Sequence, residues 1–201
     1  MLRIRGLVRS GLAPFDLDLD AHEAIAISGP SGAGKTLLLR AIADLDPNQG
    51  EIELDGRARG DMAAPAWRRL VTYMAAEPGW WSDRVGDHFL DPDPSRSLLP
   101  PLLLPPEAMD WEVARLSTGE KQRLALALVL ERTPQVLLLD EPTASLDPEA
   151  AQAVETVLHQ RLGEGAAILF VTHDSEQAGR MAKRVLTMEA GTVRAKDAEA
   201  P

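Results

Sequence analysis

The chain contains no cysteine, and this absence removes several kinds of chemistry at once. Disulfide bridges, thiolate metal sites and cysteine nucleophiles are excluded, and a reducing compartment is permitted. Long apolar runs are missing too. A membrane-spanning helix needs about 20 consecutive apolar residues, whereas the leucine-rich stretch 98–104 is interrupted by Pro100 and Pro101. The N-terminal sequence also lacks the apolar run of a signal peptide, so we expect a soluble cytoplasmic protein.

Basic residues are too few to balance the acidic ones. The sequence has 21 Lys and Arg against 31 Asp and Glu, a formal charge of −10. Such a field repels polyanions, so no nucleic-acid partner is expected. Hydrophobic residues (45%) and charged residues (26%) occur at proportions ordinary for globular proteins. A length of 201 residues suits one α/β domain with a sizeable core, and we take a single domain over 1–201 as the hypothesis.

A glycine-rich loop stands between an apolar strand-like run, 25–28, and a run of good helix formers, 37–43. It matches the P-loop pattern: Gly29, Pro30, Ser31, Gly32, Ala33, Gly34, Lys35 and Thr36. Its glycines let backbone N–H groups turn toward phosphate oxygens, and Lys35 adds a positive charge. The Thr36 hydroxyl can ligate Mg²⁺. The sequence predicts a nucleoside triphosphate site here; the alternative is an ordinary glycine turn before a helix.

Two further apolar runs, 136–139 and 167–171, are typical of buried parallel strands. Each ends in polar residues: Asp140 and Glu141 after the first, Thr172, His173 and Asp174 after the second. The carboxyl ends of parallel strands line the ligand crevice of an open α/β sheet. We therefore expect these residues to converge with the glycine loop.

The residue types at these ends suit triphosphate hydrolysis. Asp140 would hold Mg²⁺ together with Thr36. Glu141 can orient the attacking water or accept its proton, and His173 can donate a hydrogen bond to the γ-phosphate. The alternatives are a solvated helix cap for the acidic pair and a purely structural role for the histidine.

Other segments fit around this frame. The alternation within 2–27 indicates short antiparallel strands, and residues 152–162 and 176–183 indicate helices. Residues 82–112 have weak periodicity and contain six prolines, which favours an irregular insertion: Pro92, Pro94, Pro100, Pro101, Pro105 and Pro106.

Several motifs together resemble the ATP-binding subunit of ABC transporters. Residues 116–123 are similar to its LSGGQ signature: Leu116, Ser117, Thr118, Gly119, Glu120, Lys121, Gln122 and Arg123. Residues 140–143 with 145–147 resemble the Walker B and D-loop segments, and residues 172–174 the switch-histidine segment. These motifs occur in the family's order, and the resemblance covers nearly the whole chain.

The resemblance implies a fold and a partnership. The fold is a P-loop NTPase of the ABC type: a mostly parallel sheet flanked by helices, an N-terminal antiparallel part and a shortened helical subdomain over about 77–130. Two such subunits sandwich ATP, and one subunit's signature acts on the nucleotide of the other through Ser117, Thr118, Gly119 and Glu120, with Asp147 in the D-loop. The second subunit is expected to be another copy, with a related subunit left open.

The activity implied is Mg²⁺-dependent ATP hydrolysis that powers transport by a separate membrane-spanning subunit. The chain would then be peripheral on the inner face of the membrane. Two alternatives stay open: a switch that dimerises on ATP with little turnover, and a soluble ABC ATPase outside transport. The absence of an Asn-Lys-x-Asp segment disfavours a guanine-specific switch.

Three departures from the family pattern qualify this expectation. Ala76 stands where the family has a glutamine, and Thr118 replaces the first signature glycine. The aromatic residue that stacks on adenine is not evident, with Phe15 as a weak substitute. We expect a working but slow ATPase.

Trp80 and Trp81 follow the Ala76 loop, where the family docks a helix of its membrane partner. They can anchor that helix, because tryptophan is enriched at interface hot spots, or they can belong to the core. The leucines of 98–104 are expected to form the core of the helical subdomain rather than a lipid-contacting patch.

Overall fold

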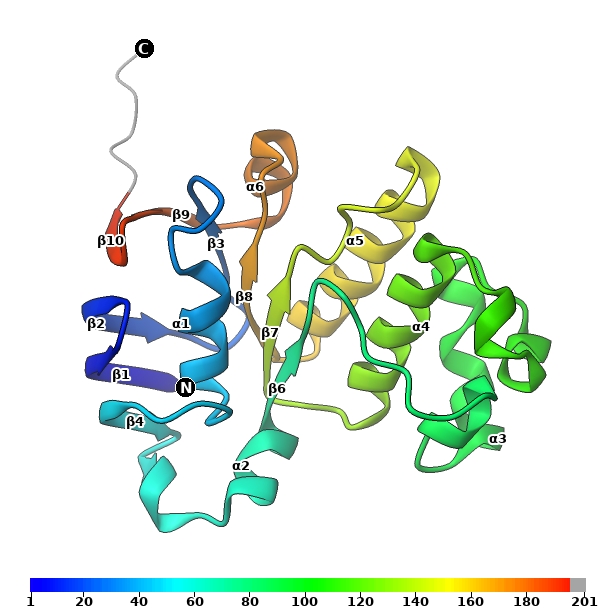
Figure 1. Cartoon of the computed structure of the whole chain (residues 1–201), viewed down its shortest axis with the longest axis horizontal. Coiled ribbons are helices and arrows are strands. Elements are labelled where there is room, and N and C mark those ends of the chain that lie inside the picture. Colours follow the sequence, from blue (N-terminus) through cyan, green and yellow to red (C-terminus); the bar gives the residue numbers. More distant parts are fainter. Residues whose placement is uncertain (196–201) are drawn as a thin grey trace.

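A six-stranded sheet forms the centre of the molecule in the computed structural model, which describes residues 1–195 (Figure 1). Its strand order is β10-β9-β3-β8-β7-β6. All neighbouring pairs are parallel except the edge hairpin of β9 and β10, which confirms the mostly parallel sheet. The strands are β3 (Ala24–Ser28), β6 (Val71–Met74), β7 (Val136–Asp140), β8 (Ala167–Val171), β9 (Arg184–Glu189) and β10 (Thr192–Ala195). Positions 196–201 of the domain expected over 1–201 lie outside the described residues.

A second sheet of four antiparallel strands, in the order β2-β1-β4-β5, forms the N-terminal part. Its strands are β1 (Leu2–Arg9), β2 (Leu12–Leu19), β4 (Gln49–Leu54) and β5 (Arg57–Ala58). The alternation in β2 buries Phe15, Leu17 and Leu19, as a strand with one solvated face requires. The antiparallel expectation for 2–27 is wrong beyond Leu19, because β3 pairs in parallel with β8 and β9.

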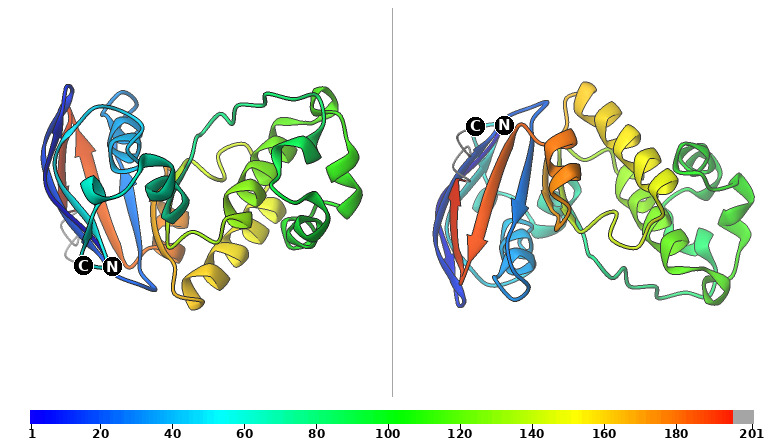
Figure 2. Two further views of the ribbon diagram at one scale, coloured as in Figure 1. Left: turned by 90° about the horizontal axis from the view of Figure 1, so that it is seen from below. Right: turned by 90° about the horizontal axis from the view of Figure 1, so that it is seen from above.

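Helices cover one face of the central sheet, and helix and sheet cover the other (Figure 2). Every residue of β7 is buried, and alternate residues belong to different halves of the core. Leu137 and Leu139 pack on the side of α4 (Thr118–Glu131), α5 (Pro148–Gly163) and α6 (Ser175–Met181). Leu138 packs on the side of α1 (Lys35–Ile42), α2 (Ala64–Leu70) and the antiparallel sheet. The helices expected over 152–162 and 176–183 are confirmed as α5 and α6, with α6 ending at Met181.

The proline-rich insertion consists of short helical turns. They are α3 (Pro92–Ser95) and the 3-10 helices η2 (Val85–His88), η3 (Arg96–Leu98), η4 (Pro100–Leu102), η5 (Pro106–Asp110) and η6 (Val113–Arg115); η1 (Arg59–Asp61) lies earlier in the chain. Prolines begin α3, η4 and η5, where a fixed φ and a missing N–H are tolerated. Leu99, Leu102 and Leu104 are buried, which confirms the expected core for these leucines, whereas Leu103 is 46% exposed. Among residues 1–195, no helix has the length and apolar character needed to cross a bilayer.

Glu131, the last residue of α4, connects this insertion to the C-terminal end of that helix through hydrogen bonds. Its carboxylate accepts hydrogen bonds from the backbone N–H groups of Leu90 and Asp91, both at 3.0 Å, and from the Ser95 hydroxyl at 2.7 Å. Three donors on one carboxylate fix the loop before α3 against the end of α4.

Replacing Glu131 by alanine is expected to lower the free energy of unfolding by about 1–3 kcal/mol, because these charge-assisted hydrogen bonds are lost. Urea unfolding followed by circular dichroism measures the change. Glu107→Ala, at an exposed site in η5, is the control and should change stability by less than about 0.5 kcal/mol. Equal stability of the Glu131 variant and the wild type would contradict this role for the carboxylate.

Candidate functional site

The polar residues that follow the central strands converge at one edge of the sheet. In the ladder, Ile27 of β3 pairs with Val171 of β8, and Asp140 of β7 pairs with the same valine. The convergence expected from the sequence is confirmed for Asp140, Glu141 and His173, which line a cavity of about 230 Å³ together with the glycine loop and the start of α1. The residues that line this cavity are Ser31, Gly32, Gly34, Lys35, Thr36, Leu37, Asp140, Glu141 and His173. Thr172 and Asp174 line neighbouring cavities instead.

Two glycines of the loop before α1 are required by their surroundings. Gly29 has φ 141°, and a Cβ there would lie 2.1 Å from the carbonyl oxygen of Met188 in β9. Gly34, the N-cap of α1, has φ 104°, and a Cβ would lie 3.0 Å from side-chain carbons of Leu12 and Met188. A side chain at position 29 would clash with the backbone carbonyl of Met188, and the positive φ at both positions would strain any other residue, so the conformation of the loop favours glycine at each.

Lys35 lies inside this loop. Its side chain is buried, and Nζ donates to the carbonyl oxygens of Gly29 and Pro30, each at 2.8 Å. The loop closes around the ammonium group and holds a positive charge at the first turn of α1. The unpaired N–H groups of that turn add to the positive potential. The loop is therefore built to receive an anion.

Three hydroxyl and carboxylate groups meet beside the loop. Asp140 is 3% exposed, and its Oδ2 accepts hydrogen bonds from Thr36 Oγ1 at 2.6 Å and from Tyr73 Oη at 3.2 Å. Burial, followed by the charge of Asp140, raises the pKa of Tyr73, so its phenol stays a donor at neutral pH.

Thr36 and Asp140 offer the hard oxygen atoms that Mg²⁺ prefers. Within residues 1–195, no three His, Cys, Asp or Glu side chains come together as a metal cage. An ion held by this pair would take its remaining ligands from a phosphate and from water, which is the usual coordination of Mg²⁺ in phosphoryl-transfer sites. The residues present therefore fit the predicted ion.

Glu141 and His173 form a pair at the mouth of the cavity. Glu141 Oε1 and His173 Nε2 are 3.1 Å apart, and both side chains are partly exposed. The backbone of Glu141 adopts φ 50°, a strained conformation for a non-glycine residue. It is held there at both ends, since its N–H donates to Val171 O at 3.1 Å and its carbonyl accepts from Gln122 Nε2 at 3.1 Å.

The signature segment forms the start of α4. Ser117 is the N-cap, and its Oγ accepts from the Glu120 N–H at 3.2 Å. Glu120 returns the contact, because its carboxylate accepts from both the N–H and the hydroxyl of Ser117 at 2.8 Å. The Ser117 N–H, with smaller contributions from its hydroxyl and nearby arginines, lowers the pKa of Glu120. The segment is thus a capping box that carries a negative charge.

The signature and the glycine loop do not share a cavity within one chain. None of Ser117, Thr118, Gly119 and Glu120 is among the residues that line the site at Lys35. Gly119 instead packs on the D-loop segment, where a Cβ would lie 3.3 Å from Ser145 O. Asp147 caps α5, accepting from the Ala150 N–H at 2.9 Å.

Phe15 does not lie where an adenine could stack on it. Its side chain is only 7% exposed and packs in the core beside the antiparallel sheet. The structure therefore does not support Phe15 as the adenine-stacking residue, because strand alternation directs its ring inward. The chain segment next to Gly34 is Gly11–Leu12, which carries no aromatic ring.

Ala76, Trp80 and Trp81 follow β6. Ala76 is exposed and has no polar side-chain atom to offer. Trp80 packs partly against the core, whereas Trp81 is 77% exposed. The core interpretation therefore suits Trp80, and the interpretation as an interface anchor suits Trp81. Both rings lie 4.8 Å from the ring of His88, centroid to centroid, and His88 Nε2 accepts from the N–H groups of Trp81 and Ser82.

Sequence patterns missed Tyr73, and they named Gln122 within the signature without its contact to the Glu141 carbonyl. Tyr73 pairs with Leu138 of β7, and only this register brings its hydroxyl to Asp140. Gln122 is buried on α4, in a position where helical periodicity predicts an apolar residue. A buried glutamine within the signature helix was the available signal.

Comparisons with known proteins agree with this arrangement. The family model described as ABC transporter matches residues 12–144. A protein named Fe(3+) ions import ATP-binding protein FbpC, from Streptomyces avermitilis, is 36% identical over 92% of this chain and 57% of its own length. The probable iron export ATP-binding protein FetA from Escherichia coli is 34% identical over 87% of this chain and 83% of its own length. The chain thus spans little more than half the length of the first of these relatives.

Solved structures show the same fold. A structure described as the ATP binding subunit of an ABC transporter superposes with a TM-score of 0.87 at 25% identity, covering 99% of this chain and 90% of that one. The ATP-binding cassette MJ0796, in a dimeric post-hydrolysis state bound to ADP and Pi, gives a TM-score of 0.85 at 22% identity over the full length of both chains. The fold is that of an ABC-type P-loop NTPase. Taken with the loop around Lys35 and the signature at the start of α4, these matches show that the chain belongs to the ABC transporter family and corresponds to its ATP-binding subunits.

Proposed function

We propose that the chain binds Mg²⁺-ATP at the loop around Lys35 and hydrolyses it between two subunits, which drives transport by a separate membrane-spanning partner. One observation carries the proposal: the buried ammonium, the Thr36–Asp140 pair and the Glu141–His173 pair all line one cavity. Anion binding, metal binding and proton transfer are the requirements of phosphoryl transfer to water.

The roles follow from the positions. The backbone N–H groups of the glycine loop, to which Pro30 contributes none, and the ammonium of Lys35 would bind the β- and γ-phosphates. Thr36 and Asp140 would hold Mg²⁺, which neutralises charge on the transferred phosphoryl group when bound. Glu141 would orient the attacking water and accept its proton, and His173 would donate to the γ-phosphate from a position fixed by Glu141.

A second copy of the chain would complete the site. The cavity at Lys35 is about 230 Å³, below the about 300–1,000 Å³ of pockets that enclose drug-sized ligands. The signature residues Ser117, Thr118, Gly119 and Glu120 lie outside it in their own chain, so they are free to close over the nucleotide of a partner, with Asp147 holding the D-loop between them. Dimer closure on ATP and reopening after hydrolysis would supply the motion for transport.

The membrane partner would dock beside Trp81. This exposed ring borders a cavity of about 320 Å³ that also includes Leu45, Tyr73 and Leu128. The lining also includes Arg68 and Arg132, so the recess is of mixed polarity. An exposed tryptophan beside a recess is typical of an anchor for a partner helix. The chain would then sit on the inner face of the membrane through that partner. Because the two relatives are named as an importer and an exporter, the proposal does not include a direction of transport.

Two features favour slow turnover, and with it the second candidate, a switch that dimerises on ATP. Ala76 offers no amide to a metal or a water. Glu120 holds the Ser117 hydroxyl and places a carboxylate where a partner's γ-phosphate would arrive. Like charges about 5 Å apart repel by roughly 1–3 kcal/mol near a protein surface.

Purified protein should release phosphate from Mg²⁺-ATP, alone or with its membrane partner. Lys35→Ala should lower the rate at least about 100-fold, because the developing charge on the phosphates loses its main cation. A coupled phosphate assay measures both. Wild-type release no faster than that of the Lys35 variant, combined with ATP-dependent dimers, would establish the switch instead of the ATPase.

Glu120→Gln should strengthen ATP-dependent association about tenfold, since about 1.4 kcal/mol of repulsion is removed. Glutamine keeps the capping box, so helix stability should hardly change. Analytical ultracentrifugation with Mg²⁺-ATP measures the association, and Glu112→Gln, just before η6 and outside the capping box, is the matched control. Association unchanged in the Glu120 variant would show that this carboxylate does not face the nucleotide.

A further inference from the structure

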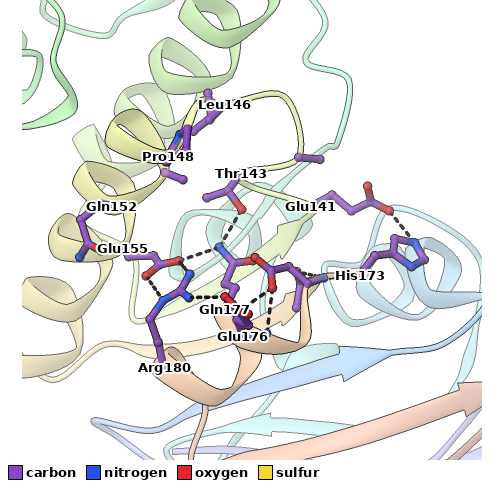
Figure 3. A pocket seen from close by; sticks show the side chains of 14 residues that line it. Glu141, Thr143, Leu146, Pro148, Gln152, Glu155, His173, Glu176, Gln177 and Arg180 are labelled. Atoms are coloured by element: carbon purple, nitrogen blue, oxygen red, sulfur yellow. Dashed lines mark hydrogen bonds and ion pairs between the residues drawn. The ribbon is translucent and has the colours of Figure 1, made fainter.

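A polar network lies behind the Glu141–His173 pair, in a cavity of about 620 Å³ between α5 and α6 (Figure 3). Its lining comes from three places: the segment that follows Glu141, the first turns of α5, and the segment from Thr172 through α6. The same segments carry the two partly exposed groups assigned above to proton transfer and phosphate binding. Contacts across this cavity can therefore affect the relative orientation of the Glu141 and His173 side chains.

Gln177 is the centre of the network. It lies on α6, its side chain is only 1% exposed, and Nε2 donates to Thr143 Oγ1 at 2.7 Å and to Glu155 Oε1 at 3.4 Å (Figure 3). Both amide hydrogens are thus directed across the cavity, one to the segment after Glu141 and one to α5.

Two cross-links join the same pair of segments. The first is the contact between Glu141 and His173 at 3.1 Å. The second joins Thr143, two positions after Glu141, to Gln177, four positions and about one helical turn after His173. A single contact would leave the histidine segment able to pivot about it, whereas two contacts fix its orientation.

A buried ion pair adds a third contact, between α6 and α5. Glu155 of α5 is 2% exposed, and Arg180 of α6 binds it in a bidentate manner, with Nε to Oε2 at 2.9 Å and Nη2 to Oε1 at 2.7 Å. The guanidinium compensates the buried carboxylate, so Glu155 can still accept from Gln177. The helix after His173 is thereby attached to α5 and to the loop after Glu141.

The buried amide of Gln177 lowers the stability of the fold, so stability does not explain why a glutamine is present here. Its Oε1 is buried and accepts no hydrogen bond from any group in residues 1–195. A leucine of similar size would avoid that cost, because an unsatisfied buried acceptor destabilises the fold. The two donated hydrogen bonds are therefore what this side chain contributes.

We propose that Gln177 is a positioning residue for the reaction: through Thr143 and Glu155 it fixes α6 and holds His173 against Glu141 in the geometry that the γ-phosphate requires. The inference rests on the function proposed above. It assigns to Gln177 no contact with nucleotide, so its loss should affect the chemical step rather than nucleotide binding.

Four variants test this assignment. Gln177→Leu removes both donors and keeps the volume, and Thr143→Val removes the acceptor on the other side. Thr143→Ser keeps the hydroxyl and is the conservative rescue. Glu176→Gln, an exposed neighbour on the same helix, is the matched control.

The readouts are kcat, the KM for ATP and the NMR ring signals of His173 in nucleotide-free protein. Gln177→Leu and Thr143→Val should lower kcat about 10- to 100-fold, the range for a reacting group misplaced by about 1 Å. Both should leave KM within about twofold and move the His173 signals, while Thr143→Ser and Glu176→Gln stay close to the wild type.

Unchanged kcat in Gln177→Leu, or an equal loss in Thr143→Ser and Thr143→Val, would overturn the inference. If the wild type itself releases no phosphate, the proposed ATPase fails, and the His173 ring signals alone then decide. Movement in Gln177→Leu and Thr143→Val but not in Glu176→Gln supports the positioning role, and unmoved signals reject it.

Discussion

Strands β7 and β8 are buried on both faces, and the rest of the site depends on this constraint. Every residue of β7 and β8 is buried, because one face packs on α4, α5 and α6 and the other on α1 and the antiparallel sheet. Polar side chains can then appear only where the strands end. Since the strands are parallel, these ends lie at one edge, and Asp140, Glu141 and His173 meet the loop that follows β3.

At that edge of the sheet, the protein's own hydrogen bonds hold the side chains of Lys35 and Asp140 in position. The Lys35 ammonium is solvated by two loop carbonyls, and Asp140 accepts two hydroxyl hydrogen bonds on one oxygen. Each arrangement satisfies a buried charge with dipoles rather than with an opposite charge. Both groups therefore remain able to form ion pairs with phosphate and metal without breaking an existing salt bridge. The partly exposed Glu141–His173 pair lies outside this buried set.

Sequence patterns were sufficient wherever function depends on backbone or on strand ends. The glycines at 29 and 34 are fixed by close contacts with β9, and residue type alone reveals such a requirement. Side-chain contacts made across register or between helices were out of reach. Tyr73 meets Asp140 only through the pairing of β6 with β7, and Gln177 meets Thr143 only through the packing of α6 beside α5. The assignment of Phe15 to adenine stacking was not supported for a related reason. Alternation shows that a side chain points inward, but not in which half of the core it packs. Trp80 and Trp81 are adjacent and identical in type, and only the fold separates the packed ring from the exposed one.

In the proposed arrangement two copies share each nucleotide, with Lys35 in one chain and the signature at Ser117 in the other. The most direct measurement is sedimentation of Glu141→Gln protein, in which hydrolysis is blocked, across a range of concentrations with Mg²⁺-ATP. We expect a dimer that forms with ATP, dissociates when ATP is removed, and is lost when the Lys35→Ala substitution is added. A protein that stays monomeric throughout, or that dimerises equally without nucleotide, would contradict it.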